Sequence, residues 1–551
     1  MKNIFKLFLI MLIAVPFSSC TKKFDEINTN PKALTVAELD QSLYGFIVRR
    51  AIYGPSYLRN GNGMQTLHSL FFDTYANYFA TTTPNFLSDR YVLVASWING
   101  SVNAFYRDCA PQIKYSVDYA KEKGFGVEEA MMTVWKVYCF HRYTDCLGPI
   151  PYSQYGNMQK SVAYDSQQEI YTSFFSELDA AIRVLKENAG TTSSIISSYD
   201  AIYSGNVDKW LKFANSLRLR LAMRVKYADA TLAKTNAEAA VADGVITSNA
   251  DNGWVKTTKD WYNAYNTITS WGEFRMSADM ESILKGYCDP RVKSYFQEAV
   301  TPDKIDDPVG VTFNFEGMRN GQSKGNRSGI AFNSLASDMA KPWVVLGDKG
   351  PDWYVMRASE SYFLKAEGAL EGWNMGSGTA QSFYEAGIKA SLEENGYANL
   401  KNLAGEDYIT SLRTPASPGS DPAAPSVILN PVSKVPVAFM ASGSKEQKLE
   451  QIITQKWIGL YPDSQEAYAE RRRTGYPILY TRIDSENPDI PAKSLPRRLT
   501  FWTTEYNTNG AEVANGINKL NAESSDGHGD LGTTRLWWDK NPNVPNVGNE
   551  K

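Results

Sequence analysis

The stretch ITQKWIGLYPDSQEAYAERRRTGYPIL, residues 453–479, decides the fold because it contains two helical segments and the turn between them. KLEQIITQKWIGLY (448–461) and SQEAYAERRRTG (464–475) each place apolar residues at helical spacing, and Pro462-Asp463 separates them. Amphipathic helices joined by so short a turn pack against each other. The stretch therefore predicts a helix pair.

The same helical spacing recurs along the chain, in 131–139, in 164–188 and in 206–229. A further segment, ASESYFLKAEGALEGW (358–373), is joined by Gly-Ser-Gly to FYEAGIKASLEENG (383–396), which predicts another pair. Several of these helices have an alanine-rich face that permits close packing. The pattern predicts a mainly α fold of tetratricopeptide-like helix pairs, although a period of ~34 residues is not kept. The apolar positions are Met131, Val134, Trp135, Tyr138, Cys139; Ile170, Phe174, Leu178, Ile182, Leu185; and Val207, Trp210, Leu211, Ala214, Leu217, Leu221, Val225.

Long segments without periodicity lie between the predicted helices. Residues 245–275 and 300–352 are rich in Gly, Asn, Asp and aromatic residues, and residues 414–436 in Pro, Ser and Ala. Loops of this length inside a compact fold are usually functional or mobile. We therefore expect a helical scaffold, mainly 35–230 and 353–480, that carries a variable loop-rich region, mainly 245–352.

The N-terminus has the pattern of a secretory signal. Lys2 and Lys6 precede an apolar run, 7–15, which is too short to span a bilayer. Ser18-Ser19 then precede Cys20, and this order resembles the lipobox of bacterial lipoproteins, with Phe17 where Leu is usual. The pattern predicts a signal peptide over 1–19, lipidation at Cys20 and a tether over 20–30. An acylated terminus is a firm membrane anchor when it carries more than one chain.

Composition excludes several classes of protein. The formal net charge of −3 lacks the concentrated basic face of a nucleic-acid binder. Four cysteines after Cys20 do not make a disulfide framework in a chain of 551 residues, although one or two bridges are possible. The 13 Trp, 32 Tyr and 24 Phe are an unusual surplus. Aromatic residues are core material first, but in an exported protein they also furnish stacking platforms.

The sequence favours neither a metal site nor a catalytic site. In YCFHRYTDCLGPIPY (138–152), His141 and Asp145 share a helical spacing, but zinc sites need four converging ligands, and Leu147-Gly148-Pro149 favours a helix end. No phosphate loop, dinucleotide fingerprint or nucleophile elbow occurs. A helical glycoside hydrolase is the competing enzyme class, but no carboxylate pair stands out. We expect neither a metal, nor a cofactor, nor an enzyme.

Two stretches have the composition of a partly exposed binding surface, with large rings placed among amides, hydroxyls and charges. They are DNGWVKTTKDWYNAYNTITSWGEF (251–274) and ATTTPNFLSDRYVLVASW (80–97). Aromatic faces stack on sugar rings while polar groups bind the hydroxyls. For any single ring, core packing is at least as good an explanation, and the hypothesis rests on the clusters. The candidate ligand-binding residues are Asn85, Phe86, Arg90, Tyr91, Trp254, Trp261, Tyr262, Tyr265 and Trp271.

The chain resembles the SusD/RagB family of outer-membrane nutrient-binding lipoproteins, in its SusD-like group. The opening stretch, 453–479, carries the most specific part of the resemblance, through its Lys-Trp helix, its acidic-aromatic turn and Arg-Arg-Thr-Gly-Tyr-Pro. Cys146 departs from the family's usual turn. The other matching stretches are CTKKFDEINTNPKALT (20–35), YTDCLGPIPYSQ (143–154), WYVMRASESYFLKAEGAL (353–370), LPRRLTFWTTEYNTN (495–509) and TTRLWWD (533–539).

The resemblance implies a single SusD-like domain over 31–551, with four tetratricopeptide-like helix pairs beneath a ligand-binding region. It implies a SusC-like TonB-dependent transporter as partner, on which the protein sits as a lid, and an anchored position facing the cell exterior. The implied ligand is an oligosaccharide, with peptides as the alternative, and Arg471–Arg473 are implied to be structural ion-pairing residues. A surface glycoside hydrolase and a purely structural lid remain the competing hypotheses.

Overall fold

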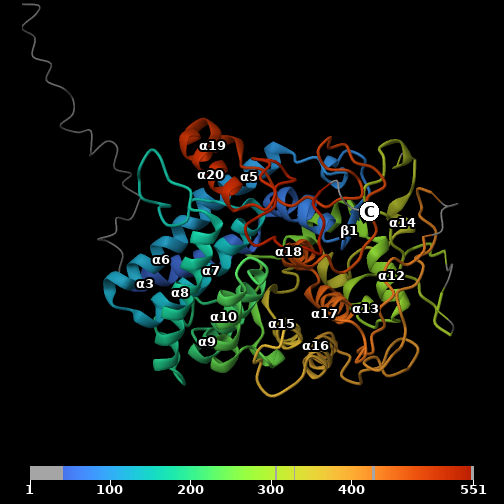
Figure 1. The fold of residues 1–551 in the computed structure, drawn as a ribbon, viewed down its shortest axis with the longest axis horizontal. Helices are drawn as coiled ribbons and strands as arrows, with labels where there is room; N and C mark the ends of the chain where they lie inside the picture. Colours follow the sequence, from blue (N-terminus) through green and yellow to red (C-terminus); the bar gives the residue numbers. More distant parts are fainter. Residues whose placement is uncertain (1–40, 304–306, 309, 328, 425–428, 548–551) are drawn as a thin grey trace, which may run out of the picture. The chain divides into compact units, whose positions relative to one another are not determined.

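The computed structural model describes residues 41–303, 307–308, 310–327, 329–424 and 429–547 (Figure 1). The predicted signal peptide (1–19), Cys20 and the tether (20–30) lie outside the described residues and stay predictions. The chain divides into two units, 1–44 and 45–551, and the fold described here is that of the second unit. In the described part of the chain, no helix has both the length and the apolarity needed to cross a bilayer.

The N-terminal half is built from long helices that end where the sequence supplies caps. Helix α7 stops at Gly148, whose φ of 86° is left-handed, so the predicted helix end at Leu147-Gly148-Pro149 is confirmed. Helix α8 begins with a capping box between Ser166 and Glu169. The elements are α3 (Gln41–Tyr53), η3 (Gly54–Ser56), α4 (Gly61–Gly63), η4 (Met64–Asp73), η5 (Leu87–Arg90), α5 (Ala95–Ala104), η6 (Phe105–Cys109), α6 (Ala110–Lys123), α7 (Gly126–Leu147), α8 (Gln167–Glu187), α9 (Val207–Arg224) and α10 (Ala230–Asp243).

The middle of the chain has only short elements, and long helices return after residue 357. The division into a helical scaffold, mainly 35–230 and 353–480, and a loop-rich region, mainly 245–352, stays a prediction. The remaining elements are η7 (Asn249–Asp251), α11 (Tyr265–Ser270), α12 (Ala278–Gly286), α13 (Val292–Tyr295), η8 (Gly325–Arg327), α14 (Phe332–Leu335), η9 (Lys341–Trp343), α15 (Ala358–Leu370), α16 (Ala380–Glu394), α17 (Lys445–Leu460), α18 (Ser464–Thr474), α19 (Thr503–Thr508) and α20 (Gly510–Glu523).

Helices that follow each other in the chain pack side by side, which confirms the predicted helix pairs and the mainly α fold. Contacts join α6 to α7, α7 to α8, α8 to α9 and α9 to α10, and a second group joins α15 to α16 and α17 (Figure 1). Small residues permit the close approach. A Cβ added to Gly387 in α16 would lie 2.7 Å from the Phe363 ring in α15.

Among the described residues, four short strands form two antiparallel pairs, each of which joins a strand within 245–352 to a strand outside it. β1 (Phe79–Thr81) pairs with β3 (Phe274–Met276) in the register Phe79–Met276, Ala80–Arg275 and Thr81–Phe274. β2 (Gly253–Val255) pairs with β4 (Trp353–Met356), with an irregularity between Gly253 and Trp254. The β1–β3 pair therefore joins the ends of the two aromatic stretches, 80–97 and 251–274.

The quoted stretch 453–479 contains the second half of α17 and the whole of α18, and these helices lie in the core. Trp457 is buried, and its indole N–H donates to the carbonyl oxygen of Ala76 at 2.9 Å. Buried ion pairs join α18 to its neighbouring helices. Arg473 of α18 pairs with Glu367 of α15, and Glu470 of α18 pairs with Lys456 of α17. Arg224 of α9 pairs with Glu466 and Glu470 of α18, and also with Asp145 of α7. Buried charges of this kind are tolerated only when they are paired.

The ion-pairing role expected for Arg471–Arg473 holds for Arg473 and is wrong for its two neighbours. Arg471 donates to the carbonyl oxygen of Tyr75 at 3.1 Å. Arg472 donates to the carbonyl oxygen of Arg497 at 2.7 Å, and its guanidinium lies 4.0 Å from the centroid of the Tyr468 ring. All three are structural, but two of them bind carbonyl oxygens because no carboxylate of the described residues lies within ion-pair distance.

Candidate functional site

The two aromatic stretches meet beside the β1–β3 pair. The Thr82 hydroxyl donates to the carbonyl oxygen of Gly272 at 2.7 Å, and its N–H donates to that of Glu273 at 2.9 Å. The Phe86 ring stacks on Phe274 with centroids 5.8 Å apart, and Trp97 meets Phe86 edge-on at 6.1 Å. The fold thus places side chains from 80–97 directly against 272–274, as one patch.

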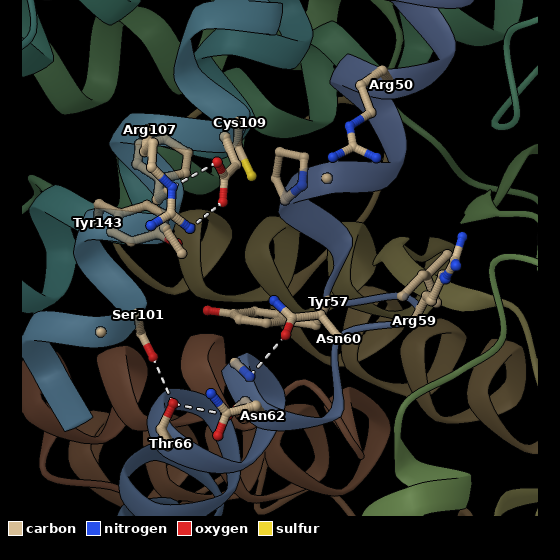
Figure 2. Close-up of a pocket in the computed structure, with 18 of the residues that line it drawn as sticks. Arg50, Tyr57, Arg59, Asn60, Asn62, Thr66, Ser101, Arg107, Cys109 and Tyr143 are labelled. Atoms are coloured by element: carbon tan, nitrogen blue, oxygen red, sulfur yellow. Dashed lines mark hydrogen bonds and ion pairs between the residues drawn. The ribbon is translucent and has the colours of Figure 1, made fainter.

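A pocket of about 590 Å³ opens near this patch, between the end of α3, the turn before α4, and the α5–η6 segment (Figure 2). We call it the large pocket. Its volume lies within the range of ~300–1,000 Å³ that is usual for ligand sites. Figure 2 shows arginine side chains spread around it, with hydroxyl and amide groups at one end. The residues that carry its chemistry are Arg50, Tyr57, Arg59, Asn60, Asn62, Thr66, Ser101, Phe105, Arg107, Asp108, Tyr143 and Trp261.

Local hydrogen bonds hold the polar end of the large pocket in shape. The Asn60 side chain caps α4 by accepting from the Gly63 N–H at 2.9 Å. The Thr66 hydroxyl lies 2.8 Å from the Ser101 hydroxyl and donates to the carbonyl oxygen of Asn62 at 2.8 Å (Figure 2). These bonds tie the turn before η4 to α5, so the donors and acceptors at this end are already positioned for a ligand.

The charges in the large pocket are mainly positive. Arg107 holds Asp108 through two hydrogen bonds, of 2.8 and 2.6 Å, and this contact lowers the pKa of the Asp108 carboxyl. The Arg50 guanidinium lies 5.4 Å from the centroid of the Trp261 ring. Burial raises the pKa of the Cys109 thiol to about 12, so the thiol stays protonated at neutral pH. The pocket offers hydrogen-bond donors and aromatic walls, and its one thiol is inert.

Trp261 is the predicted site residue that lines the large pocket. It is half-buried and stacks on Tyr53 of α3, with centroids 4.8 Å apart and planes 9° from parallel. Tyr262 is half-buried, and its carbonyl oxygen accepts from the Arg59 N–H at 2.8 Å. Trp271 is 47% exposed, Asn85 is exposed and Phe86 is half-buried. Trp254 lies elsewhere, in a second cleft.

The partial exposure expected of the aromatic stretches is wrong for Arg90, Tyr91 and Tyr265, which are buried. Arg90 Nε donates to Glu486 Oε1 at 2.6 Å, and the Tyr91 hydroxyl donates to the carbonyl oxygen of Ser494 at 2.6 Å. The Tyr265 hydroxyl donates to the Asp73 carboxylate at 3.0 Å. The polar groups of these three side chains are thus bound inside the protein and are not free to bind a ligand.

A family model described as SusD-like, the SusD and RagB outer membrane lipoproteins, matches residues 26–539. The chain belongs to this family. Solved SusD-like structures match almost end to end. A chitin-binding SusD homologue from Flavobacterium johnsoniae is 37% identical, with 91% of this chain and 99% of that chain covered and a TM-score of 0.78. A SusD homologue from Bacteroides thetaiotaomicron is 31% identical, with 90% and 99% covered and a TM-score of 0.78.

A third SusD homologue, from Bacteroides vulgatus, is 29% identical, with 92% of this chain and 98% of that chain covered and a TM-score of 0.79. Among curated proteins, none matches the chain. The family resemblance stated from the sequence motifs and the SusD-like fold are therefore confirmed.

Most of the large pocket of this SusD-like protein was missed by sequence reasoning. Its walls come from α3, from the turn before α4 and from η6, in stretches whose aromatic content is ordinary. One signal was present: LRNGNG (58–63) is a dense turn sequence between two apolar runs. Asn60 and Asn62 belong to it. No such signal marks Arg107, because its place in the pocket wall depends on the packing of η6 against η3.

His141 and Asp145, which share a helical spacing in 138–152, are buried, and Asp145 belongs to the buried network of ion pairs around α18. Asp145 accepts hydrogen bonds from the Tyr171 hydroxyl and, at 3.1 Å, from Arg224 Nε. Burial and neighbouring arginines lower the pKa of His141. Over the residues that the structure describes, no group of three or more His, Cys, Asp or Glu side chains is placed to hold a metal ion. Cys109, Cys139, Cys146 and Cys288 are free thiols.

Proposed function

We propose that this SusD-like protein is a cell-surface lipoprotein that captures an oligosaccharide and delivers it, as a lid, to a SusC-like TonB-dependent transporter. One observation carries the proposal: in a chain of this family, the large pocket combines a tryptophan wall, Trp261, with fixed hydroxyl and amide groups. That combination suits a sugar, whose ring faces stack on aromatic rings and whose hydroxyls need hydrogen-bond partners.

The proposal includes the anchor. Cleavage of residues 1–19 and lipidation of Cys20 would hold the protein at the outer membrane, facing outward, with 20–30 as the tether and 31–551 as one SusD-like domain. Tethering keeps the binding site at the transporter mouth, which raises the effective ligand concentration there without any new contact. Mass spectrometry of the mature N-terminus tests this part, and an unmodified Cys20 would overturn it.

The proposed ligand class is a chitin-type oligosaccharide, built from N-acetylated amino sugars. The 37% identical homologue is described as chitin-binding, and its chain is covered over 99% of its length. An uncharged acetamido sugar presents both an amide and hydroxyls to groups such as Asn60 and Asn62. The arginines of the large pocket donate equally well to sugar hydroxyls and to the carbonyl oxygen of an acetamido group.

The large pocket favours a protein that binds the saccharide without cleaving it over a glycoside hydrolase. Retaining and inverting glycosidases use a pair of carboxyl groups across the scissile bond. Among the described residues that line the large pocket, Asp108 is the only carboxylate, and its pairing with Arg107 keeps it ionised. It therefore lacks both the partner and the proton that glycoside cleavage requires.

The test is calorimetric titration of the mature protein with a panel of neutral oligosaccharides, acidic oligosaccharides and peptides, followed by product analysis. We expect saturable binding of chitin oligosaccharides and no cleavage products. Product formation would favour the hydrolase, and peptide binding alone would favour a peptide-binding relative. If the protein binds none of these ligands but still forms a complex with the transporter, the hypothesis of a purely structural lid would be favoured.

A further inference from the structure

The positive charge of the large pocket is a local feature of the molecule. The whole chain has a formal net charge of −3, whereas the described residues that line the pocket include three guanidinium groups and one carboxylate. The guanidinium groups come from different elements: Arg50 from α3, Arg59 from the turn before α4, and Arg107 from η6 (Figure 2). A ligand that fills the pocket is therefore exposed to positive charge from more than one side.

The one carboxylate in the pocket wall does not balance this charge. Both oxygens of Asp108 accept hydrogen bonds from Arg107, at 2.8 and 2.6 Å. These bonds lower the pKa of the Asp108 carboxyl, and the nearby charge of Arg50 lowers it further. Among the described residues, no carboxylate lies within ion-pair distance of Arg50 or Arg59. Positive charge therefore remains in the pocket after the Arg107–Asp108 pair has formed.

The tryptophan of the pocket wall offers no separate site for a cation. A cation is attracted to an aromatic ring within about 6 Å of its centroid. The Arg50 guanidinium already lies 5.4 Å from the centroid of the Trp261 ring, which also stacks on Tyr53. The two exposed charges beside Trp261, Lys259 and Asp260, are opposite in sign. An ammonium group of a ligand at this ring would therefore meet a guanidinium and no free carboxylate.

The charge of the pocket wall stays constant between pH 6 and pH 9. Burial raises the pKa of the Tyr57 and Tyr143 hydroxyls, and it raises that of the Cys109 thiol to about 12, so all three are neutral in this range. Asp108 is ionised throughout because its pKa is lowered. Arginine side chains remain protonated in proteins. Any change in affinity over this pH range therefore reports a titrating group of the ligand.

We propose that the large pocket selects saccharides by charge: it binds N-acetylated amino sugars and rejects the same sugars after their acetyl groups have been removed. The inference rests on the proposed function, in which this pocket binds a chitin-type oligosaccharide. Deacetylation turns each acetamido group into an amine, which is a cation at neutral pH. Guanidinium groups donate to an acetamido oxygen but repel an ammonium group. Arg50 and Arg59 determine the specificity, because Asp108 neutralises Arg107.

The experiment compares chitin tetrasaccharide with the tetrasaccharide of glucosamine, which differs from it only by the missing acetyl groups. Calorimetric titration of the full mature chain gives both affinities at pH 6 and at pH 9. The variants are Arg50→Gln and Arg59→Gln, singly and combined. Arg183→Gln is the matched control, because Arg183 is exposed on α8 and does not line the large pocket. Thermal unfolding confirms that each variant is folded.

At pH 6, we expect the wild type to bind chitin tetrasaccharide at least about tenfold more tightly than glucosamine tetrasaccharide, since like charges repel at short range. Raising the pH to 9 should narrow this difference severalfold, because the ligand amines lose their protons and bind more tightly. The combined Arg50→Gln and Arg59→Gln variant should already show the narrower difference at pH 6. The Arg183→Gln control should keep the full difference.

Equal or tighter binding of glucosamine tetrasaccharide by the wild type at pH 6 would overturn this inference and leave the proposed function standing. A preference for chitin tetrasaccharide that persists unchanged at pH 9 and in the folded combined variant would overturn it too, because lost acetyl contacts would then be the cause. Failure of the wild type to bind either tetrasaccharide would overturn the proposed function as well.

Discussion

Arg473 and Glu367 form a buried two-point ion pair that ties α18 to α15, with Nη1–Oε1 and Nη2–Oε2 distances of 2.7 and 2.6 Å. Arg473 also holds Glu470, and Glu367 also accepts from Lys226. Removing one partner leaves buried charge without compensation. We expect Arg473→Ala to lower the free energy of unfolding by about 3–5 kcal/mol, measured by urea denaturation.

The matched control for that change is Arg413→Ala, because Arg413 pairs with Glu406 near the surface at 2.7 Å. Exposed pairs contribute little to stability, because water and salt screen them. Equal losses in the two variants would contradict the structural role assigned to the α15–α18 pair.

Acid should destabilise the fold through the carboxylates of this network. Arginine and lysine neighbours lower the pKa of Glu367, Glu466 and Glu470 below the ordinary value for glutamate. Their stabilising contribution is therefore complete above the unfolded-state pKa of about 4.3 and is lost as the pH falls below it toward the lowered values. Urea unfolding at pH 6, 4.5, 3.5 and 2.5 should show the free energy dropping steeply between the last three. A constant free energy across them would be inconsistent with the network.

Glu316 should act in the opposite direction. Burial, together with the nearby carboxylates of Glu281 and Asp303, raises the pKa of Glu316 to about 8. A carboxyl with a raised pKa costs the folded state free energy above that pH, and the cost disappears as the pH falls toward the unfolded value. We expect Glu316→Gln to stabilise the protein by about 1 kcal/mol or more at pH 8.5 and to have little effect at pH 5. A gain that is the same at both pH values would point to packing instead.

Gly286, at the end of α12, should tolerate no side chain. A Cβ there would lie 2.3 Å from Ala416 N and from Thr414 O, which are backbone atoms and cannot move aside alone. We expect Gly286→Ala to lower the melting temperature, at a cost of about 1–3 kcal/mol. Gly100→Ala is the control, because no atom lies within 4 Å of its added Cβ, and it should stabilise α5 by roughly 0.5–1 kcal/mol. If both substitutions stabilise, the packing of 414–416 on α12 is not as described.

Trp261 and Trp271 should contribute to saccharide binding as separate platforms. We expect Trp261→Ala or Trp271→Ala to weaken binding of a chitin oligosaccharide by ~1–3 kcal/mol, by analogy with stacking of bases on aromatic side chains. Calorimetric titration gives the affinity, and Trp373→Ala serves as the control, because Trp373 is half-buried and does not line the large pocket. Unchanged affinity in a folded variant removes that ring from the site.

The long helices could be predicted from sequence because each buries one continuous face. Val207, Trp210 and Leu217 mark α9 by spacing alone, and they are fully buried. The three-residue strands β1 and β3 could not be predicted, since alternation cannot be recognised over so few residues. Their pairing is a long-range contact that no local pattern signals. The burial of Tyr91 and Tyr265 and the exposure of Trp271 likewise depend on contacts with distant parts of the chain.

The site was only partly predictable for the same reason. Trp261 was identified because rings placed among polar residues are poor core composition. Arg50 and Arg107 carry no local signal, and they line the same pocket because η3, which follows α3, packs against η6. The local sequence indicates which residues have the chemistry to bind a ligand. Which of these residues line the pocket depends on how distant elements pack together.

The β1–β3 pair has a consequence for how specificity can change in such a protein. Three residue pairs and the Thr82 hydrogen bonds fasten the stretch that bears Phe86 to the stretch that bears Trp271, although nearly 200 positions separate them in the chain. Replacing one stretch with that of a relative would break the interlocking contacts of the other. Exchange of ligand preference between relatives by loop grafting should therefore succeed only when both stretches are transferred together.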